Sequence, residues 1–233
     1  MLDAMSIKKA IQYDNSTGLS TGFVNLGDNI EHGEEATEVL VFMIVGLRGH
    51  WKAPVAYFFT HTLQASTQQQ LVLHTISRLR EIGVQVCALT MDGHAMNVAM
   101  CSLLGCQLDP AKHMKTYFYV EGCSEPIYVF MDACHMIKLV RNMVQACRVI
   151  KAPSGEVRWR FIELLHQQQQ DLGLRTANRS QRHVDFQKQK MKVNLAVQTI
   201  SDSVAKALQF LLQMDLAQTN QWKTAQKHVS NSI

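Results

Sequence analysis

The segment VQVCALTMDGHAMN, residues 84–97, decides the fold of this chain. An apolar, partly β-branched run leads to a carboxylate at Asp92, and Gly93 follows as a turn residue. This pattern is typical of a buried strand that carries one acid to the carboxyl edge of a sheet, where α/β proteins place their functional groups. The segment IYVFMDACHMIKL repeats it with Asp132. Two acids at two strand ends indicate metal-ion or phosphate chemistry.

The segments before and around this strand predict an ordered set of elements. Short turns join four apolar runs, which favours an antiparallel meander. Apolar residues then recur at helical spacing before Gly83. A second helical pattern, which ends at Gly105, lies between the strand that leads to Asp92 and the strand that leads to Asp132. We therefore expect strands over 2–9, 21–26, 38–48 and 54–60, and helices over 66–82 and 97–104.

The order of these elements favours one α/β fold class. A strand–helix–strand unit with acids at both strand ends predicts a parallel pair with a right-handed crossover. Three antiparallel strands followed by α-β-α-β is the order of a ribonuclease-H-like fold. A doubly wound nucleotide-binding fold is the alternative. That fold would not begin with an antiparallel meander, and the chain has no glycine-rich phosphate loop.

The second part of the chain, from about residue 136, is predicted to be helical. Expected helices cover 136–149, 160–170 and 188–214, the last as one helix or two, and the turn 153–155 separates the first two. The boundary between domains is placed at residue 150, with a ribonuclease-H-like domain over 1–150 and an all-helical region over 151–233. The expected core stripe of the last helix is Met191, Leu195, Val204, Leu208 and Leu211.

Composition narrows the class of protein. The 47% hydrophobic and 18% charged residues are typical of a globular chain rather than a disordered one. No apolar run is long enough for a membrane span, and no signal peptide opens the chain, so we expect an intracellular protein. None of the six cysteines forms a CxxC pair, which favours reduced structural thiols over a zinc site. Basic residues from Lys138 to Lys192 could contact phosphate or simply form a solvated helical surface.

Two carboxylates are the candidate metal ligands. A ribonuclease-H-like site needs carboxylates that converge on two divalent ions about 4 Å apart. Asp3 on the first strand and Asp92 at the end of the fourth would be neighbours in such a sheet. Magnesium prefers oxygen ligands, so acids suffice. Asp14 and Asp28 are weaker candidates because both lie in turn-like sequence.

A structural role is the competing interpretation of these acids. Asp92-Gly93 could be only a strand-end turn, and Asp132 could cap the helix that follows it. His135 would then be a core histidine at the start of that helix. From the residues alone, both interpretations stay open.

Taken together, several segments resemble the P-element-type transposases, including the vertebrate member that carries a THAP domain. They occur in the same order from Leu2 to Leu208: LDAMSIKKAIQYD, GHWKAPVAYFF, REIGVQVCALTMDGHAMN, LLGC, YVFMDACHMIKLVRN and KMKVNLAVQTISDSVAKAL. The resemblance implies a ribonuclease-H-like catalytic domain that cuts and joins DNA with a DDE triad and Mg²⁺.

The resemblance assigns roles to single residues. Asp3 falls on the first catalytic acid of the family, in an Asp-Glu-Met motif where this chain has Asp3-Ala4-Met5, and Asp92 falls on the second. The third acid of the family is a glutamate far downstream, beyond a helical insertion that binds GTP in the P-element enzyme. Residues from about 151 onward resemble the start of that insertion.

Two parts of the family pattern are not found in these 233 residues. The segment with the third acid does not occur, nor does the C2CH spacing of the zinc-binding THAP module. We therefore expect a fragment or remnant of a DDE transposase that does not cleave DNA, and no complete GTP site. The alternatives are a domesticated module that binds DNA or protein without catalysis, and a partial gene model. The resemblance further implies DNA and a homo-oligomer as partners and the nucleus as location.

Overall fold

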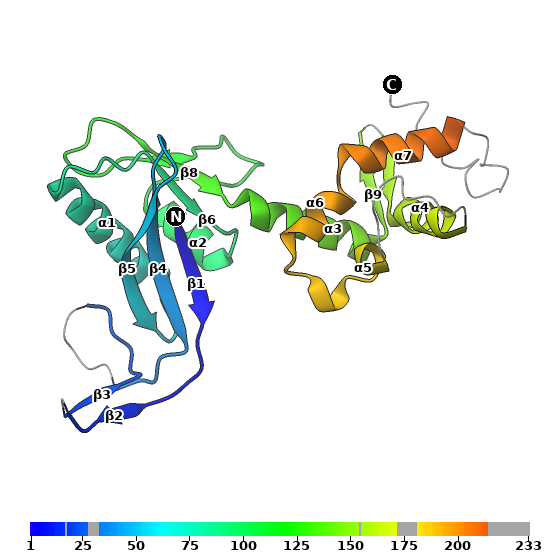
Figure 1. Ribbon diagram of the computed structural model, residues 1–233. Helices are drawn as coiled ribbons and strands as arrows, with labels where there is room; N and C mark the ends of the chain where they lie inside the picture. Colours follow the sequence, from blue (N-terminus) through cyan, green and yellow to red (C-terminus); the bar gives the residue numbers. More distant parts are fainter. Residues whose placement is uncertain (17, 28–32, 154, 172–180, 214–233) are drawn as a thin grey trace. The chain divides into compact units, whose positions relative to one another are not determined.

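The structure, a computed structural model, describes residues 1–16, 18–27, 33–153, 155–171 and 181–213 (Figure 1). The contact pattern divides the chain into two compact units, Met1–Asp132 and Ala133–Ile233. The boundary expected at residue 150 instead falls within a β-hairpin of the second unit. This hairpin follows the helix Ala133–Cys147 directly and contacts it, so both belong to the second unit.

An antiparallel sheet opens the first unit. Strand β4 (Glu38–Val45) lies between β1 (Leu2–Ser6) and β5 (Lys52–Thr60), with Asp3 paired to Val41. Alternation of apolar side chains along β4 buries Leu40 and Phe42 on one face, and a register shift follows Phe42. The expected meander is therefore present. One of its expected strands is not.

That difference concerns residues 21–26, of which only Thr21 belongs to a strand. Phe23 and Asn25 make only isolated bridges, whereas a short hairpin of β2 (Gln12–Asp14) and β3 (Leu19–Thr21) precedes them. Gly22 and Gly27 have φ values of +107° and +84°, which interrupt extended backbone on both sides of the expected strand. The prediction was wrong because glycine conformation outweighed the apolar pattern.

A second sheet carries the acid of the segment 84–97. Strand β6 (Ala88–Met91) pairs in parallel with β8 (Ile127–Met131), and β7 (Tyr117–Phe118) pairs with β8 in the antiparallel sense. β6 also contacts β1 of the first sheet. The expected parallel pair is confirmed, and Asp92 directly follows its first strand.

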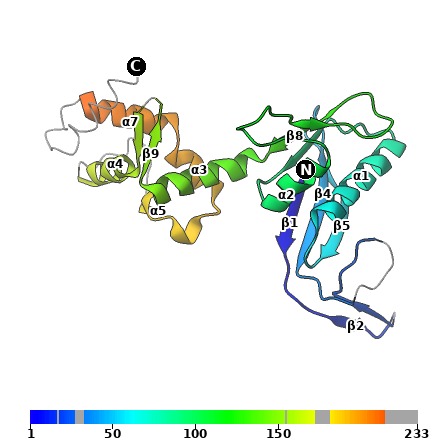
Figure 2. The ribbon, with the colours of Figure 1, turned by 180° about the vertical axis from the view of Figure 1, so that it is seen from behind.

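Two helices cover one face of these strands. Helices α1 (Ala65–Glu81) and α2 (Ala95–Leu103) both lie in front of the strands in Figure 2, and they contact each other. The periodic residues of α1 are buried, and Gly83, with φ +80°, follows its end. The shared core contains Leu2, Leu40, Phe42, Phe58, Val72, Ile76, Leu89, Met91, Met100 and Phe118.

The second unit contains a β-hairpin as well as helices, so the expected all-helical region is wrong. Strands β9 (Val149–Ala152) and β10 (Gly155–Arg158) form the hairpin. Arg148 has a φ of +62°, which ends the preceding helix, and β-branched residues follow it. The helices are α3 (Ala133–Cys147), α4 (Trp159–Asp171), α5 (Gln181–Val184), the 3₁₀ turn η1 (Gln187–Gln189), α6 (Val193–Thr199) and α7 (Asp202–Gln213).

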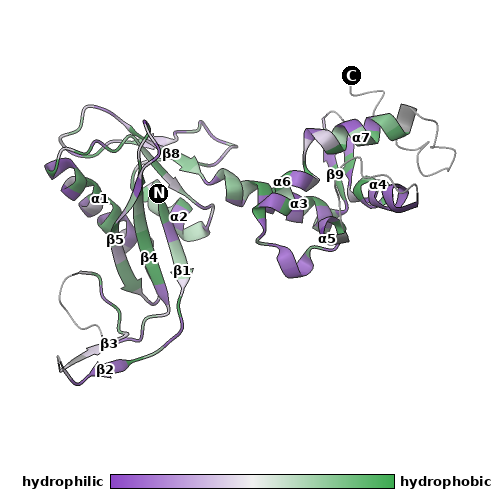
Figure 3. Ribbon diagram, viewed as in Figure 1, coloured by the Kyte–Doolittle hydropathy of each residue, from purple (hydrophilic) through white to green (hydrophobic). Residues whose placement is uncertain are grey.

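A small apolar core holds α4 and α7 together. Leu164 and Leu165 pack with Val204 and Leu211, and the apolar faces of these helices are visible in Figure 3. The expected stripe is confirmed for Leu195, Val204, Leu208 and Leu211, which are buried or partly buried. Met191 is 72% exposed because it precedes α6 rather than continuing a longer helix. Among the described residues, none of the helices has the length and apolar character of a membrane span.

Candidate acid site

The two candidate acids of the sequence line one pocket. Asp3 lies on β1 and Asp92 directly after β6, and both contribute to a cavity of about 400 Å³ between the strand ends and the first turns of α1 and α2. Asp3 and Asp92 line the same pocket because the strands β1 and β6 contact each other. Polar side chains that the sequence did not indicate also line this pocket: Glu38, His61, Gln68, His94 and Asn97.

Asp92 has a closely held carboxylate. Its Oδ1 accepts hydrogen bonds from the backbone N–H of His94, at 3.0 Å, and from Nδ2 of Asn97, at 2.6 Å. His94 is the N-cap of α2, and its Nδ1 accepts from the backbone N–H of Met96. The turn interpretation and the ligand interpretation of Asp92 are therefore compatible: the turn to α2 is what orients the carboxylate.

Asp3 is an exposed acid with one local bond. Its Oδ1 accepts from the backbone N–H of Ala4 at 3.0 Å. Among the described residues, no group of three or more His, Cys, Asp or Glu side chains is close enough together to hold a metal ion. Three carboxylate residues, Asp3, Glu38 and Asp92, nevertheless line the pocket, and carboxylate oxygens are the ligands that a hard cation prefers.

The other acids that the sequence offered as candidates are Asp14, Asp28 and Asp132, and neither Asp14 nor Asp132 lines this pocket. Asp14 ends β2, where its Oδ1 accepts from the backbone N–H and the hydroxyl of Ser16, as expected of turn chemistry. Asp28 lies outside the described residues. Asp132 donates its backbone N–H to the carbonyl of Met91 at 2.7 Å, and His135 is half-buried in α3.

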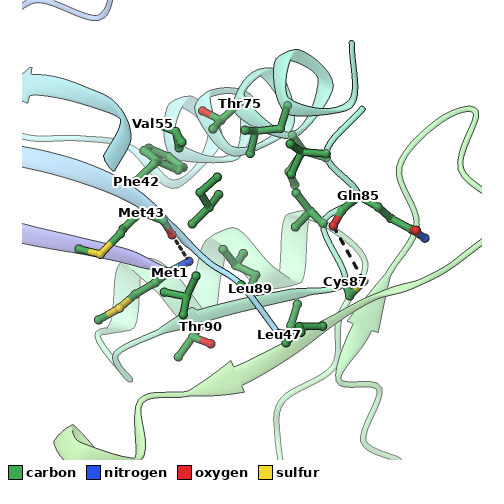
Figure 4. A pocket seen from close by; sticks show the side chains of 18 of the residues that line it. Met1, Phe42, Met43, Leu47, Val55, Thr75, Gln85, Cys87, Leu89 and Thr90 are labelled. Atoms are coloured by element: carbon green, nitrogen blue, oxygen red, sulfur yellow. Dashed lines mark hydrogen bonds between the residues drawn. The ribbon is translucent and has the colours of Figure 1, made fainter. Parts of the chain in front are cut away.

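A second pocket of the first unit is apolar. Figure 4 shows this cavity of about 500 Å³, with Thr75 of α1 on one side and Leu89 and Thr90 of β6 on another. Its side chains are uncharged. The apolar pocket is lined by residues 42–47, from β4 and the turn after it, whereas the acid pocket is lined by Glu38 and Leu40 of the same strand. The two pockets therefore lie at opposite ends of β4.

Four arginines of the second unit are buried or ion-paired within it. Arg141 is fully buried, and Arg148 and Arg160 both pair with Glu163. Arg158 pairs with Glu156 at 2.6 Å. Lys188, Lys190 and Lys192, which precede α6, are exposed.

Similarity to known proteins extends over both units. Residues 1–105 match the family described as "TNP-like, RNase H N-terminal domain", and residues 134–231 match "TNP-like, GTP-binding insertion domain". Human "DNA transposase THAP9" is 33% identical over 225 residues, which are 93% of this chain and 24% of that protein. "Transposable element P transposase" of Drosophila melanogaster is 27% identical over 141 residues, 60% of this chain and 16% of that protein.

A solved structure shares the fold. The chain of the "Drosophila P element transposase strand transfer complex" matches with a TM-score of 0.72 and 22% identity, over 99% of this chain and 48% of that one. This likeness and the matching family description confirm the expected ribonuclease-H-like fold of the first unit. The chain spans about a quarter or less of the length of the curated relatives. By the similarity of both of its units, the chain belongs to the P-element-type transposase family.

Proposed function

We propose that the first unit supplies part of a metal-dependent DNA-processing site, in which Asp3 and Asp92 hold a divalent cation such as Mg²⁺. The observation that carries the proposal is the shared pocket, to which β1 and β6 bring the two carboxylates. A bound divalent ion would polarise a phosphodiester oxygen and activate the attacking hydroxyl. The family of the chain supports DNA as the substrate and the nucleus as the location.

The contribution of each acid follows from its surroundings. Asp92 is oriented by two donors on Oδ1, so its carboxylate presents a fixed direction to the pocket. Asp3 is exposed on β1 and can turn toward a cation in the pocket. Asp3 and Asp92, the two proposed ligands, are fewer than two-metal chemistry requires, so we propose that these 233 residues by themselves bind a cation without cleaving DNA.

Manganese binding and DNA nicking together test this proposal. Electron paramagnetic resonance of Mn²⁺ measures its affinity for the wild-type chain and for Asp92→Asn, which removes the charge with little change of volume. A matched control is Glu81→Gln, which also removes one charge, from an exposed pair with Arg78 that contributes little to stability. We expect at least tenfold weaker binding in Asp92→Asn only.

Two results would contradict the proposal. Equal Mn²⁺ affinities of the wild type and Asp92→Asn would remove Asp92 as a ligand. Nicking of supercoiled DNA by the purified chain, dependent on Mn²⁺ and lost in Asp92→Asn, would show that the 233 residues are catalytically sufficient.

A second candidate function is DNA binding by the second unit without catalysis. Lys188, Lys190 and Lys192 are exposed within five residues, and they have no ion-pair partner among the described residues. Phosphate contacts make affinity fall steeply with salt. Replacement of the three lysines by glutamine should then reduce the slope of log affinity against log salt by about 3, roughly one per lysine. An unchanged slope would exclude these residues as the contact.

A further inference from the structure

A chain of side-chain hydrogen bonds connects Asp92 to the helix α1. Asn97 lies in the first turn of α2, and its Nδ2 donates to Oδ1 of Asp92 at 2.6 Å. Gln68 lies in the first turn of α1, and its Nε2 donates to Oδ1 of Asn97. All three residues line the acid pocket. Three elements of the fold therefore meet in one polar contact.

The ionised carboxylate of Asp92 determines which group donates and which accepts in each of these hydrogen bonds. An ionised carboxylate only accepts hydrogen bonds, so the amide that faces it must present its NH₂ group. Asn97 consequently turns its oxygen away from Asp92, and Gln68 must present its own NH₂ group to that oxygen. Gln68 is only 3% exposed, so water cannot readily replace this bond.

The bonds distinguish the two oxygens of Asp92. Oδ1 accepts from both Asn97 and the backbone of His94. Oδ2 has no hydrogen-bond partner among the residues that the structure describes. The carboxylate is thus held through one oxygen, and the other is available to a ligand in the pocket.

We propose that Asn97, fixed by Gln68, is a positioning residue that orients Asp92 toward a divalent cation. The inference rests on the proposed function of Asp92 as a metal ligand. Outer residues that orient a ligating group commonly change metal affinity by about 10- to 100-fold. Asn97 acts through Asp92 and does not itself contact the cation.

Gln68→Glu tests the proposal with almost no change of shape. A glutamate cannot donate to Oδ1 of Asn97, so Asn97 turns its NH₂ group toward residue 68 and its oxygen toward Asp92. The bond to Asp92 is then lost. The matched control is Gln70→Glu, an exposed residue two positions along α1 that adds the same charge. We expect Mn²⁺ affinity to fall at least tenfold in Gln68→Glu and in Asn97→Leu, and to stay within twofold of the wild type in Gln70→Glu.

The outcomes separate this inference from the proposed function. If Asp92→Asn abolishes Mn²⁺ binding but Gln68→Glu and Asn97→Leu bind as the wild type does, the positioning role is wrong and the ligand role stands. If Asp92→Asn binds normally, the proposed function itself fails. Circular dichroism of each variant shows whether it is folded.

A measurement on the wild type covers the case in which the variants do not fold. The side-chain amide protons of Asn97, assigned by nuclear magnetic resonance, should be shifted from free-amide values and protected from exchange. Their signals should also broaden on addition of Mn²⁺ to the wild type. Signals at free-amide values in the wild type, unaffected by Mn²⁺, would overturn the inference.

Discussion

The guanidinium carbon of Arg141 lies 3.8 Å from the centre of the Phe186 ring, and both side chains are fully buried. Arg141 also donates from Nη2 to the carbonyl of Lys190 at 2.6 Å. These contacts join α3 to the segment between α5 and α6. Nε of Arg141 donates to Oδ1 of Asn142 at 3.1 Å, whereas Nη1 has no hydrogen-bond partner among the described residues. Stacking on Phe186 and two hydrogen bonds therefore hold the cation.

Truncation of Arg141 should destabilise the second unit. Arg141→Ala leaves a cavity and an unpaired carbonyl at Lys190, which we expect to cost about 2–4 kcal/mol in the free energy of unfolding. Arg141→Met keeps most of the volume and should cost less, about 1 kcal/mol. Urea unfolding followed by circular dichroism measures both. Arg182→Ala, at an exposed arginine of α5, is the control, and equal midpoints for Arg141→Ala and this control would contradict the prediction.

Gly22 cannot accept a side chain without movement of the backbone. A Cβ at Gly22 would overlap the carbonyl oxygen of Ala10, and the φ of Gly22 is +107°. We expect Gly22→Ala to cost about 3 kcal/mol, because both the strained φ and the overlap oppose it. Hydrogen exchange at Ala36, whose N–H donates to the carbonyl of Gly22, should report the local opening.

Gly33 is the matched control for that steric effect. Its φ is also positive, at +68°, but apart from its chain neighbours no described residue has an atom within 4 Å of the position of a Cβ. Gly33→Ala should therefore cost only about 1 kcal/mol, the penalty of left-handed backbone. If the two variants lose equal stability, the overlap with Ala10 has no energetic effect.

Alkaline pH should destabilise the first unit through Cys101. Burial, reinforced by the neighbouring Cys106 thiol, raises the pKa of Cys101 from 9.0 to about 12. The unfolded chain loses this proton near pH 9, whereas the folded chain keeps it. The stabilisation is therefore complete below about pH 9 and is lost as the pH rises toward 12, by about 1 kcal/mol per pH unit.

A comparison of unfolding free energies at pH 8 and pH 10.5 measures this effect. Cys101→Ala removes the titrating thiol, so its stability should decrease less over the same interval than that of the wild type. Cys147→Ala, at an exposed cysteine of the second unit, should decrease as the wild type does. An identical pH dependence of all three proteins would refute the assignment.

Local patterns in the sequence were sufficient for much of the fold. The periodicity of residues 66–82 and the apolar run before Asp92 predicted α1 and β6, because each pattern fits only one element of that length. The hairpin of β9 and β10 was missed. Its alternating residues follow a helix directly, and only the positive φ of Arg148 separates the two. The positive φ of Arg148 could not be predicted from the sequence, because this backbone conformation is typical of glycine and not of arginine.

Some residues of the acid pocket could be predicted from the sequence, and others could not. Strand order alone placed Asp3 beside Asp92, since the two acids lie on strands that neighbour each other in the predicted fold. Glu38 and Gln68 were not predicted as pocket residues. Their positions depend on the start of β4 and on the angle at which α1 crosses the sheet, which are non-local features. Asn97 lies within the segment 84–97, but its bond to Asp92 requires the turn at His94.

The place of β1 beside β6 has a consequence for the kinetics of folding. Four strands, β2 to β5, and the helix α1 lie between β1 and β6 in the sequence. A contact between segments that are so distant in the sequence has a large entropic cost of loop closure. We therefore expect it to form late in folding. We therefore expect the two acids to share a pocket only after β4, β5 and α1 have packed. Cation binding at this pocket would therefore stabilise the last step of folding of the first unit, and it would slow unfolding more than it accelerates folding.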